Sequence, residues 1–515
     1  MGEHSLAVGI DLGTTFSSVS IVNDNGDPEI LVNAEGERLT PSAVFFDEES
    51  IVIGELAKYN STIHPNEVIQ FVKREMGNGD FYVKHHGRKL SPIDISALIL
   101  KKLKQDSETL LGDEIRYAVL TVPAYFDEKH RRATEQAGEI AGFKVLNLIN
   151  EPTAAAIAFG VLKSEVDETV LVYDLGGGTF DATLVWVERK GETIRILSTD
   201  GDSRLGGKDF DDAIIRKCVD KFKSEHNFDP SEDAAESQQL RLDAEKAKKE
   251  LSARPKTTIL VRAGGLRSQV TITRDEFNEA IKPKIDTTLA LVRSVLRMAK
   301  VQPSEVDRIL MIGGSTRIPI VREMVSGMFT KEVDVSINPD EAVSLGASIM
   351  AAKEVAKIPN ESIPSSVEEK IGGINITDVV SHSIGIEASA PGTMQKINSI
   401  LIKKNSPIPC EVSKEFVTSI PGQTAVKLTV FQGEFQNPSL CNPIGDFFMT
   451  GLPPNRPPGK RVRVTVACTA NGTVQITAKD IESGAETNTH VNYAFNDSGS
   501  QVSAKKLWME SLAIE

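Results

Sequence analysis

The first two-thirds of the chain alternate short apolar runs with longer polar stretches. Four of these runs (residues 7–10, 117–122, 170–173 and 308–312) are rich in β-branched residues and end at a turn. Unbroken runs of this kind are typical of strands buried on both faces. Between them, residues 127–141 and 237–252 show helical spacing and many charges. The alternation predicts an α/β architecture.

Two parts of this region repeat one another. The segment DLGTTF at residues 11–16 precedes an alternating strand pattern at 18–22, and DLGGGTF at 174–180 precedes another at 181–187. A glycine turn followed by a strand, found twice, predicts a duplicated two-lobed unit. Chance similarity between two β-turns is the weaker interpretation, because the match extends into the following strand.

The pattern changes near residue 358. Residues 358–369 (IPNESIPSSVEE) are polar and punctuated by proline, which is typical of a linker. Alternating strand patterns follow at 383–386, 400–402, 425–432, 461–468 and 473–478, and Asn471-Gly472 favours a tight hairpin turn between the last two. We therefore expect an all-β sandwich of roughly 120 residues, followed by a short helix at 502–514.

Composition and charge exclude several classes of protein. The 515 residues are 40% apolar and 25% charged, as in an ordinary globular protein, and the net charge is −14. A strongly basic nucleic-acid binder is therefore disfavoured, although a local basic patch is not. The four cysteines (Cys218, Cys410, Cys441 and Cys468) are far apart in sequence and are interpreted as incidental thiols of a reduced chain. No signal peptide or membrane span is recognisable, so we expect a cytoplasmic protein.

Three glycine turns follow predicted strands and are the first candidates for chemistry. A glycine after a buried strand lets backbone N–H groups approach an anion, and three such turns from two lobes suit a chain of phosphates. The sequence has no P-loop, and its first turn lacks the dinucleotide spacing. Asp11, Asp174 and Asp181 lie beside the turns, where carboxylates suit magnesium. The alternative interpretation of any one of these aspartates is that its side chain caps the turn and binds no metal.

The motifs GIDLGTT, TVPAYF, INEPTAAAIAFG, DLGGGTFD, LGGKDFD and IGGSTRIP occur in this order, and NPDEAVSLGA and FQGE follow. Over roughly residues 5–495 the chain resembles the seventy-kilodalton heat-shock chaperones, the DnaK-like family. The resemblance implies an actin-like, two-lobed ATPase domain (1–365), an interdomain linker (366–378), a β-sandwich peptide-binding domain (379–500) and a short helical tail (501–515) without the family's lid.

The resemblance also assigns roles to residues of the expected cleft. Lys73 matches the lysine that orients the attacking water, Glu151 a carboxylate that assists it, and Thr179 the threonine beside the γ-phosphate. Asp11, Asp174 and Asp181 match the carboxylates around magnesium, which they hold largely through water. Further residues match the phosphate, ribose and adenosine contacts: Gly13, Thr14, Thr15, Gly176, Gly177, Glu245, Lys248, Lys249, Ser252, Gly313, Gly314, Ser315, Arg317 and Asp340.

Helix 241–252 has a second interpretation as an ordinary solvated charged face, which the close match to the family's adenosine helix makes the weaker one. Lys249 stands where many members have an arginine that stacks on adenine, and arginine stacks better. In the sandwich, Ile386, Phe416, Val426 and Leu428 match the central peptide pocket. The alternative is that these four are ordinary core residues.

The resemblance implies an ATP-dependent chaperone of the stress response that hydrolyses ATP to ADP and phosphate. Its cofactors would be ATP or ADP with Mg²⁺, and K⁺ is a further candidate ion. Its partners would be unfolded polypeptides, a J-domain co-chaperone and a nucleotide exchange factor, without nucleic acid or a membrane span.

Four departures from the family pattern concern the chaperone function. The lid is missing, the linker reads Ile374-Asn-Ile-Thr-Asp378 in place of a leucine run, and Asn147 replaces an arginine that contacts J-domains. Ser389 and Ser419 replace apolar residues over the peptide. An ATP-binding scaffold or regulatory partner with weak client binding is therefore the alternative function. A sugar-kinase-like enzyme is a distant third, because it leaves the sandwich unexplained.

Overall fold

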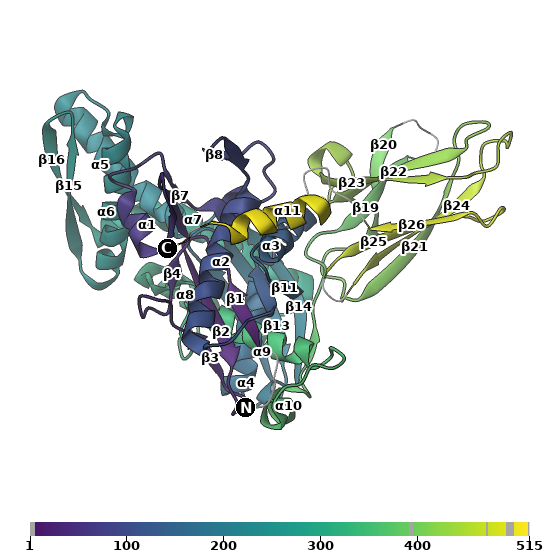
Figure 1. Ribbon diagram of the computed structural model, residues 1–515, viewed down its shortest axis with the longest axis horizontal. Coiled ribbons are helices and arrows are strands. Elements are labelled where there is room, and N and C mark those ends of the chain that lie inside the picture. Colours follow the sequence, from purple (N-terminus) through teal and green to yellow (C-terminus); the bar gives the residue numbers. More distant parts are fainter. Residues whose placement is uncertain are drawn as a thin grey trace.

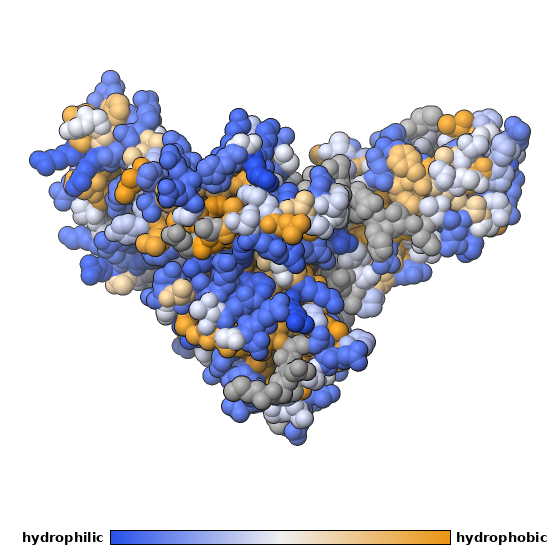
Figure 2. All heavy atoms as spheres, viewed as in Figure 1, coloured by the Kyte–Doolittle hydropathy of each residue, from blue (hydrophilic) through white to orange (hydrophobic). Residues whose placement is uncertain are grey.

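The computed structural model describes residues 6–390, 393, 395–469, 472–490, 499–512 and 514. Two large sheets, covered and separated by helices, form the part up to residue 377, and two further sheets form the part after it (Figure 1). Figure 2 shows that one face of the molecule is mainly hydrophilic, with apolar residues reaching it in small groups. In the part of the chain that the structure describes, no helix is both long enough and apolar enough to cross a bilayer.

The two large sheets repeat one arrangement of strands. The first has the order β11-β10-β1-β2-β3 and the second β17-β12-β13-β14-β18. In each, an antiparallel meander (β1-β2-β3 or β12-β13-β14) is flanked by a parallel strand beside its first member (β10 or β17). This repetition agrees with the duplication that the glycine turns predict.

The bounds of these strands follow the apolar runs of the sequence. The first sheet contains β1 (Ala7–Asp11), β2 (Phe16–Val22), β3 (Pro28–Leu31), β10 (Tyr117–Val122) and β11 (Lys144–Asn150), with β4 (Thr40–Pro41) paired to β2. The second contains β12 (Glu168–Leu175), β13 (Phe180–Val187), β14 (Thr193–Asp202), β17 (Arg308–Ile312) and β18 (Asn375–Thr377). Smaller pairings join β5 (Ala43–Phe46), β6 (Ile51–Ile53) and β7 (Val68–Gln70), then β8 (Val83–His85) and β9 (Arg88–Leu90), and finally β15 (Lys256–Ala263) and β16 (Leu266–Thr273).

Helices α4 (Glu151–Lys163) and α9 (Ala342–Val355) form the layer between the two large sheets. Their small residues, such as the alanines at 154–156, are fully buried and share one core with β10, β12 and β17. Close helix packing needs such small side chains. Helix α10 (Ser365–Ile371) packs on the same core and leads into β18, so the segment predicted as a linker contains a helix and a strand.

The other helices cover the outer faces of the sheets. Helices α2 (Pro92–Leu111) and α3 (Glu128–Ile140) pack on the first sheet, and α5 (Gly207–His226), α6 (Ala234–Ala253), α7 (Arg274–Ala299) and α8 (Pro319–Phe329) on the second. Helix α1 (Glu55–Asn60) lies beside β5–β7. Helix α2 begins at a capping box, in which Ser91 and Asp94 bond to one another's backbone N–H, and ends at Gly112 in the left-handed region.

The part after residue 378 consists of two four-stranded sheets that share one core. One has the order β20-β19-β22-β23 and the other β21-β24-β25-β26. Their strands are β19 (Ile384–Ser389), β20 (Lys396–Ile402), β21 (Cys410–Val417), β22 (Ala425–Gln432), β23 (Asn442–Thr450), β24 (Arg461–Cys468), β25 (Val474–Asp480) and β26 (Glu486–His490). The predicted alternation is present in β24, where Val462, Val464 and Val466 are buried and the residues between them are exposed or partly exposed. Strands β24 and β25 pair as expected, but Asn471 of the predicted turn lies outside the described residues.

Helix α11 (Gly499–Glu510) follows the sandwich in sequence but packs on the first-sheet part, against α3 (Figure 1). Met509 is buried in the core of that part, and Trp508 and Leu512 pack around it. Lys505 forms an ion pair with Asp94 at 2.8 Å. The chain after the sandwich is therefore bound to the helices of the first sheet.

The four cysteines are free thiols, and their spacing in the fold differs from their spacing along the chain. The cysteines are far apart along the chain, but two of them are neighbours in the fold, because β21 and β24 pair antiparallel with Cys410 directly opposite Cys468. Cys218 is a buried residue of α5, and Cys441 is buried directly before β23. Separation in sequence predicts nothing about separation across a sheet.

Candidate functional site

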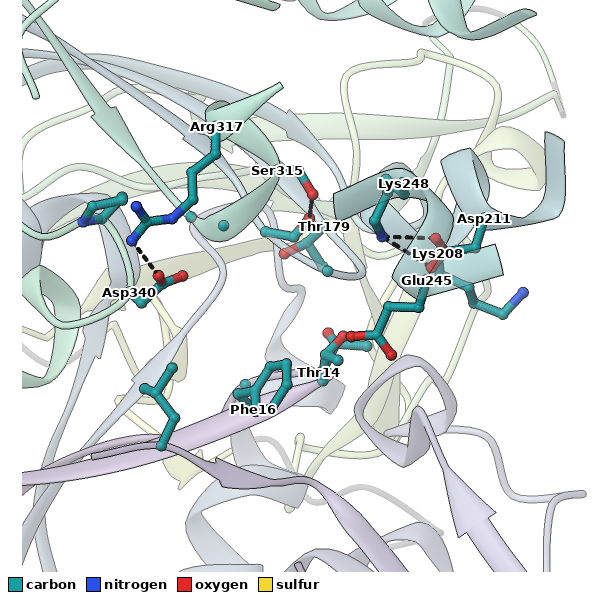
Figure 3. A pocket seen from close by; sticks show the side chains of 18 of the residues that line it. Thr14, Phe16, Thr179, Lys208, Asp211, Glu245, Lys248, Ser315, Arg317 and Asp340 are labelled. Carbon is teal, nitrogen blue, oxygen red and sulfur yellow. Dashed lines mark hydrogen bonds and ion pairs between the residues drawn. The ribbon is translucent and has the colours of Figure 1, made fainter. Parts of the chain in front are cut away.

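A cleft of about 400 Å³ opens between the two large sheets, where their glycine turns meet (Figure 3). Every residue assigned to the nucleotide by resemblance lines this cleft except Asp181. Many of the lining residues come from the turn after β1, from the turn after β12, from the 3₁₀ turn Gly314–Arg317 after β17 and from α6. The structure therefore brings together residues that lie more than 300 positions apart in sequence.

The glycine turns leave no room for side chains. A Cβ atom on Gly177 would lie 2.0 Å from Oγ1 of Thr15, so the second turn touches the first. Gly313 has φ of +81°, in the left-handed region, and a Cβ there would lie 2.4 Å from the carbonyl oxygen of Leu175. The backbone of the glycine turns therefore faces the cleft without side chains, and its N–H groups are available to phosphate oxygens.

A buried lysine–carboxylate pair lies at the base of the cleft. Lys73 stands in a short 3₁₀ helix (Val72–Glu75), and its Nζ donates to Oε1 of Glu151 at 2.5 Å. Glu151 is the first residue of α4. Burial lowers the pKa of Lys73, but the charges of Glu151 and Asp11 outweigh this effect and raise it overall. Lys73 therefore remains a cation in the interior of the protein.

The aspartates beside the turns are buried together. Asp174 and Asp181 are directly opposite on β12 and β13, and Asp11 accepts a hydrogen bond from Thr121 at 2.9 Å. Burial raises the pKa of Asp11, and burial with the nearby Glu151 raises the pKa of Asp181 to about 8. The pKa of Asp174 is raised well above its ordinary value, by burial and by the carboxylates around it.

This carboxylate set fits a divalent cation that is bound largely through water. The negative charges of the carboxylates repel one another, and Lys73 offsets only part of this repulsion. An added cation would therefore lower the energy of the site. Among the described residues no group of three or more His, Cys, Asp or Glu side chains is arranged as a direct metal-binding cluster. Asp181 stands behind the cleft wall, where its Oδ1 accepts from the backbone N–H of Tyr125 at 3.1 Å.

Helix α6 forms the side of the cleft predicted to hold adenosine. Lys248 bonds to Asp211 at 2.9 Å, and elsewhere on the rim Arg317 bonds to Asp340 at 2.6 Å (Figure 3). Lys249 reaches Glu245 at 2.7 Å and lies 5.5 Å from the ring centroid of Phe16. This lysine therefore contacts an aromatic ring of the protein itself.

Sequence reasoning missed several residues in the cleft and beside it. Lys58 of α1 forms an ion pair with Glu245 of α6 at 2.7 Å, which joins the two sides of the opening. Arg74 bonds to the carbonyl oxygen of Gly178 at 2.7 Å and to Asp209 at 2.6 Å. The cleft itself is lined by further residues that were missed: Phe16, Phe71, Lys208, Asp211 and Arg241. Phe16, Lys208 and Asp211 stand within quoted motifs, but nothing local to Lys58 indicates a partner on α6.

Facing glycine turns, buried carboxylates and a buried lysine are the features of a phosphate-binding cleft in an α/β protein. The family model described as Hsp70 protein matches residues 7–511. The match covers nearly the whole chain, and the chain belongs to the Hsp70 family, as its motifs predict. Members of this family are chaperones that in general bind ATP or ADP with Mg²⁺ and hydrolyse ATP.

The four residues assigned to the peptide pocket divide into two pairs. Ile386 and Leu428 are buried in the core of the sandwich, whereas Phe416 and Val426 pack at its margin and are partly exposed. In this structure the first pair has the surroundings of core residues. The second pair is accessible to a ligand.

The junction between the two parts of the molecule centres on Asp378. Its Oδ2 accepts hydrogen bonds from Asn150 and from Thr153, both at 3.0 Å, and burial raises its pKa. Asn150 and Thr153 flank Glu151 at the start of α4. The junction and the carboxylate of the cleft are therefore held by one helix terminus.

Loops of the sandwich add further contacts at this junction. His382 lies against Tyr125, with ring centroids 4.4 Å apart, and Lys404 forms an ion pair with Asp200 at 2.7 Å. Nearby, the Oδ1 of Asn147 is buried and accepts no hydrogen bond from the described residues. Asn147, which stands where the family has an arginine that contacts J-domains, therefore lies close to the junction. It lines a small cavity with Arg131 and Arg132.

Glu128 at this junction makes stability depend on pH. Burial raises its pKa to about 7 from an ordinary 4.5, although Arg132 acts to lower it. Between these values the folded chain retains a proton that the unfolded chain loses, so stability falls as pH rises through this window. We expect Glu128→Gln to raise the melting temperature by a few degrees at pH 8, with the gain vanishing near pH 4.5.

The matched control for this prediction is Glu135→Gln. Glu135 lies on the same helix and also contacts Arg132, at 2.8 Å, but is partly exposed. Melting curves of both variants and the unaltered chain from pH 4.5 to 8.5 test the expectation. A constant offset between Glu128→Gln and the unaltered chain would contradict it.

Proposed function

We propose that this chain is an ATP-dependent molecular chaperone that couples ATP hydrolysis to the binding and release of unfolded apolar polypeptide segments. The observation that carries the proposal is the shared terminus of α4, where Glu151 meets Lys73 in the cleft and its neighbours hold Asp378 at the junction. A change at either place is transmitted to the other through a displacement of one helix end.

The proposal includes the division into domains implied by the resemblance. Residues 1–365 would be an actin-like ATPase domain, 366–378 a linker, 379–500 a peptide-binding sandwich and 501–515 a helical tail. The repeated order of strands and the shared core of the two later sheets support this division.

Each group in the cleft would have a limited role in hydrolysis. Phosphoryl transfer to water depends on positioning and charge stabilisation more than on covalent chemistry. Lys73 would stabilise negative charge on the transferred phosphoryl group, and Glu151 would orient the attacking water. Asp11, Asp174 and Asp181 would hold Mg²⁺, which neutralises phosphate charge when bound. The backbone N–H groups of the glycine turns would fix the phosphates, and Glu245, Lys248 and Ser252 the adenosine.

Single-turnover ATP hydrolysis with and without an unfolded apolar peptide tests the proposed function. Acceleration by the peptide supports a chaperone whose sandwich and cleft communicate. Hydrolysis that ignores the peptide favours the alternative, an ATP-binding scaffold or regulatory partner. A J-domain protein added to the same assay tests whether Asn147 has removed that stimulation.

Peptide binding itself is tested with Val426→Phe. Val426 is partly exposed at the margin of the sandwich core. The phenyl ring of phenylalanine is larger than the valine side chain and would fill the space that a peptide side chain would occupy. We expect at least a tenfold loss of affinity for an apolar peptide, measured by fluorescence anisotropy. Val335→Phe, at an exposed site of the α/β part, is the control. Unchanged affinity in a folded Val426→Phe protein would contradict the assignment.

A further inference from the structure

The opposed cysteines Cys410 and Cys468 belong to no part of the proposed function. Cys410 is the first residue of β21 and Cys468 the last of β24, and the two are Cα partners in the antiparallel register. Directly opposed residues of an antiparallel pair have Cα atoms roughly 4.5–5.5 Å apart. Disulfides bridge Cα separations of roughly 4.4–6.8 Å, so the backbone already has a suitable spacing.

The two side chains also point to the same face of the sheet. Opposed residues share a face, and Cys468 is buried in the sandwich core with Cys410 partly buried against it. Their register places the start of β21 directly beside the end of β24. Both cysteines lie at an end of the strand pair, where a small approach of the two Cβ atoms disturbs few neighbours.

The pair adjoins the segment that meets the junction. Ile408, two residues before Cys410, donates its backbone N–H to the carbonyl oxygen of Asp378 at 2.9 Å. Cys468 lines a small cavity with Glu128, Asp378 and Gln432. A bond between the cysteines would therefore join β24 to the strand that begins where the sandwich contacts residue 378.

We propose that Cys410 and Cys468 are a reversible oxidation site that forms an intramolecular, cross-strand disulfide in response to hydroperoxides. The sulfur of Cys410 attacks one peroxide oxygen, so that an S–O bond forms, the O–O bond breaks and water leaves. The sulfur of Cys468 then displaces the oxygen of this sulfenic acid as a second water, and an S–S bond forms. Two thiols lose two electrons and two protons, and hydrogen peroxide is reduced to two waters.

The surroundings assign the order of the two steps. Burial raises the pKa of Cys468 to about 12, and burial raises that of Cys410 as well, although a backbone hydrogen bond with Cys468 opposes the rise. Besides Cys410, the charged groups acting on Cys468 are Glu128 and Arg131 of α3 and Asp378 of the junction. The partly exposed Cys410 is therefore the reacting thiolate, and its oxidation is slow at neutral pH and accelerates with rising pH.

The experiment uses the full chain, treated with a small excess of hydrogen peroxide at pH 8. The expected result is a fall from four free thiols to two, a 410–468 cross-linked peptide in a non-reducing digest, and full recovery with dithiothreitol. A Cys218→Ser/Cys441→Ser variant should form the same cross-link, whereas Cys410→Ser should not. The disulfide closes a loop of roughly 60 residues, so the oxidised sandwich should melt several degrees higher.

Three results would overturn the proposal. They are four thiols remaining after treatment of the unaltered chain, a sulfinic or other adduct on Cys410 without the cross-link, and cross-links between separate chains on a non-reducing gel. Because the unaltered chain gives each of these readouts, the test does not depend on how well a cysteine variant folds. None of the readouts requires ATP hydrolysis or peptide binding.

Discussion

Replacing Lys73 with methionine is expected to lower single-turnover ATP hydrolysis by at least about 100-fold while nucleotide affinity changes only a fewfold. The variant keeps a side chain of similar length but removes the one cation that contacts Glu151 at 2.5 Å. The buried Asp11 and Asp174 also lose the opposing charge that acts on them. The charge that stabilises the transferred phosphoryl group is therefore missing, whereas the glycine turns and α6 are unchanged.

Lys300→Met is the matched control, since this lysine is exposed at the end of α7 and does not line the cleft. Hydrolysis is measured with excess protein over radiolabelled ATP, and affinity by titration with a fluorescent nucleotide. Because removing one member of a buried ion pair destabilises a protein, melting curves must show that the variant is folded at the assay temperature. Hydrolysis within tenfold of the unaltered chain would show that Lys73 has no major catalytic role.

Replacing Asp378 with alanine is expected to abolish peptide stimulation of hydrolysis and to leave the basal rate within about threefold. The carboxylate accepts from Asn150 and Thr153, both at 3.0 Å, and alanine would leave these two donors without that acceptor. A lost acceptor in a buried site costs about 1–3 kcal/mol for each unsatisfied donor, which weakens the attachment of residue 378 to the start of α4. Nothing in the cleft itself is changed.

Asp378→Asn provides an intermediate case for this prediction. The amide retains one acceptor oxygen, so we expect partial stimulation, between the values of the alanine variant and the unaltered chain. Asp446→Ala, at an exposed site of β23, should leave stimulation intact. Full peptide stimulation in Asp378→Ala would mean that coupling follows another route, for example the contacts of His382 and Lys404.

Strands were the most predictable part of the fold. The bounds of β10, β17, β22 and β24 are those of the apolar or alternating runs in the sequence. A strand that is buried on one face shows alternating apolar residues, and a strand buried on both faces shows an unbroken apolar run, so both can be recognised in the sequence. The helix and strand within residues 365–377 were not predicted, because their few apolar residues, Val367 and Ile371, are buried only by the core that α4 and α9 provide.

The cleft was predictable to the extent that its residues lie within motifs. Glycines and carboxylates at strand ends indicate phosphate chemistry locally, and the resemblance supplied the lysines. Lys58 was missed because its role depends on Glu245, which is supplied by α6 on the other side of the opening. The opposition of Cys410 and Cys468 was missed for the same reason, since strand register is a property of the whole sheet.

The packing of α11 on α3 gives the sandwich two attachments to the rest of the molecule. The chain leaves the α/β part near Asp378 and has returned to it by Val502, where the helix packs on the core of the first sheet. A body connected to its neighbour through both ends of its chain has fewer accessible orientations than a body on one tether. A protease cut near residue 378 would accordingly leave both fragments associated, and the sandwich would separate only when α11 also detached.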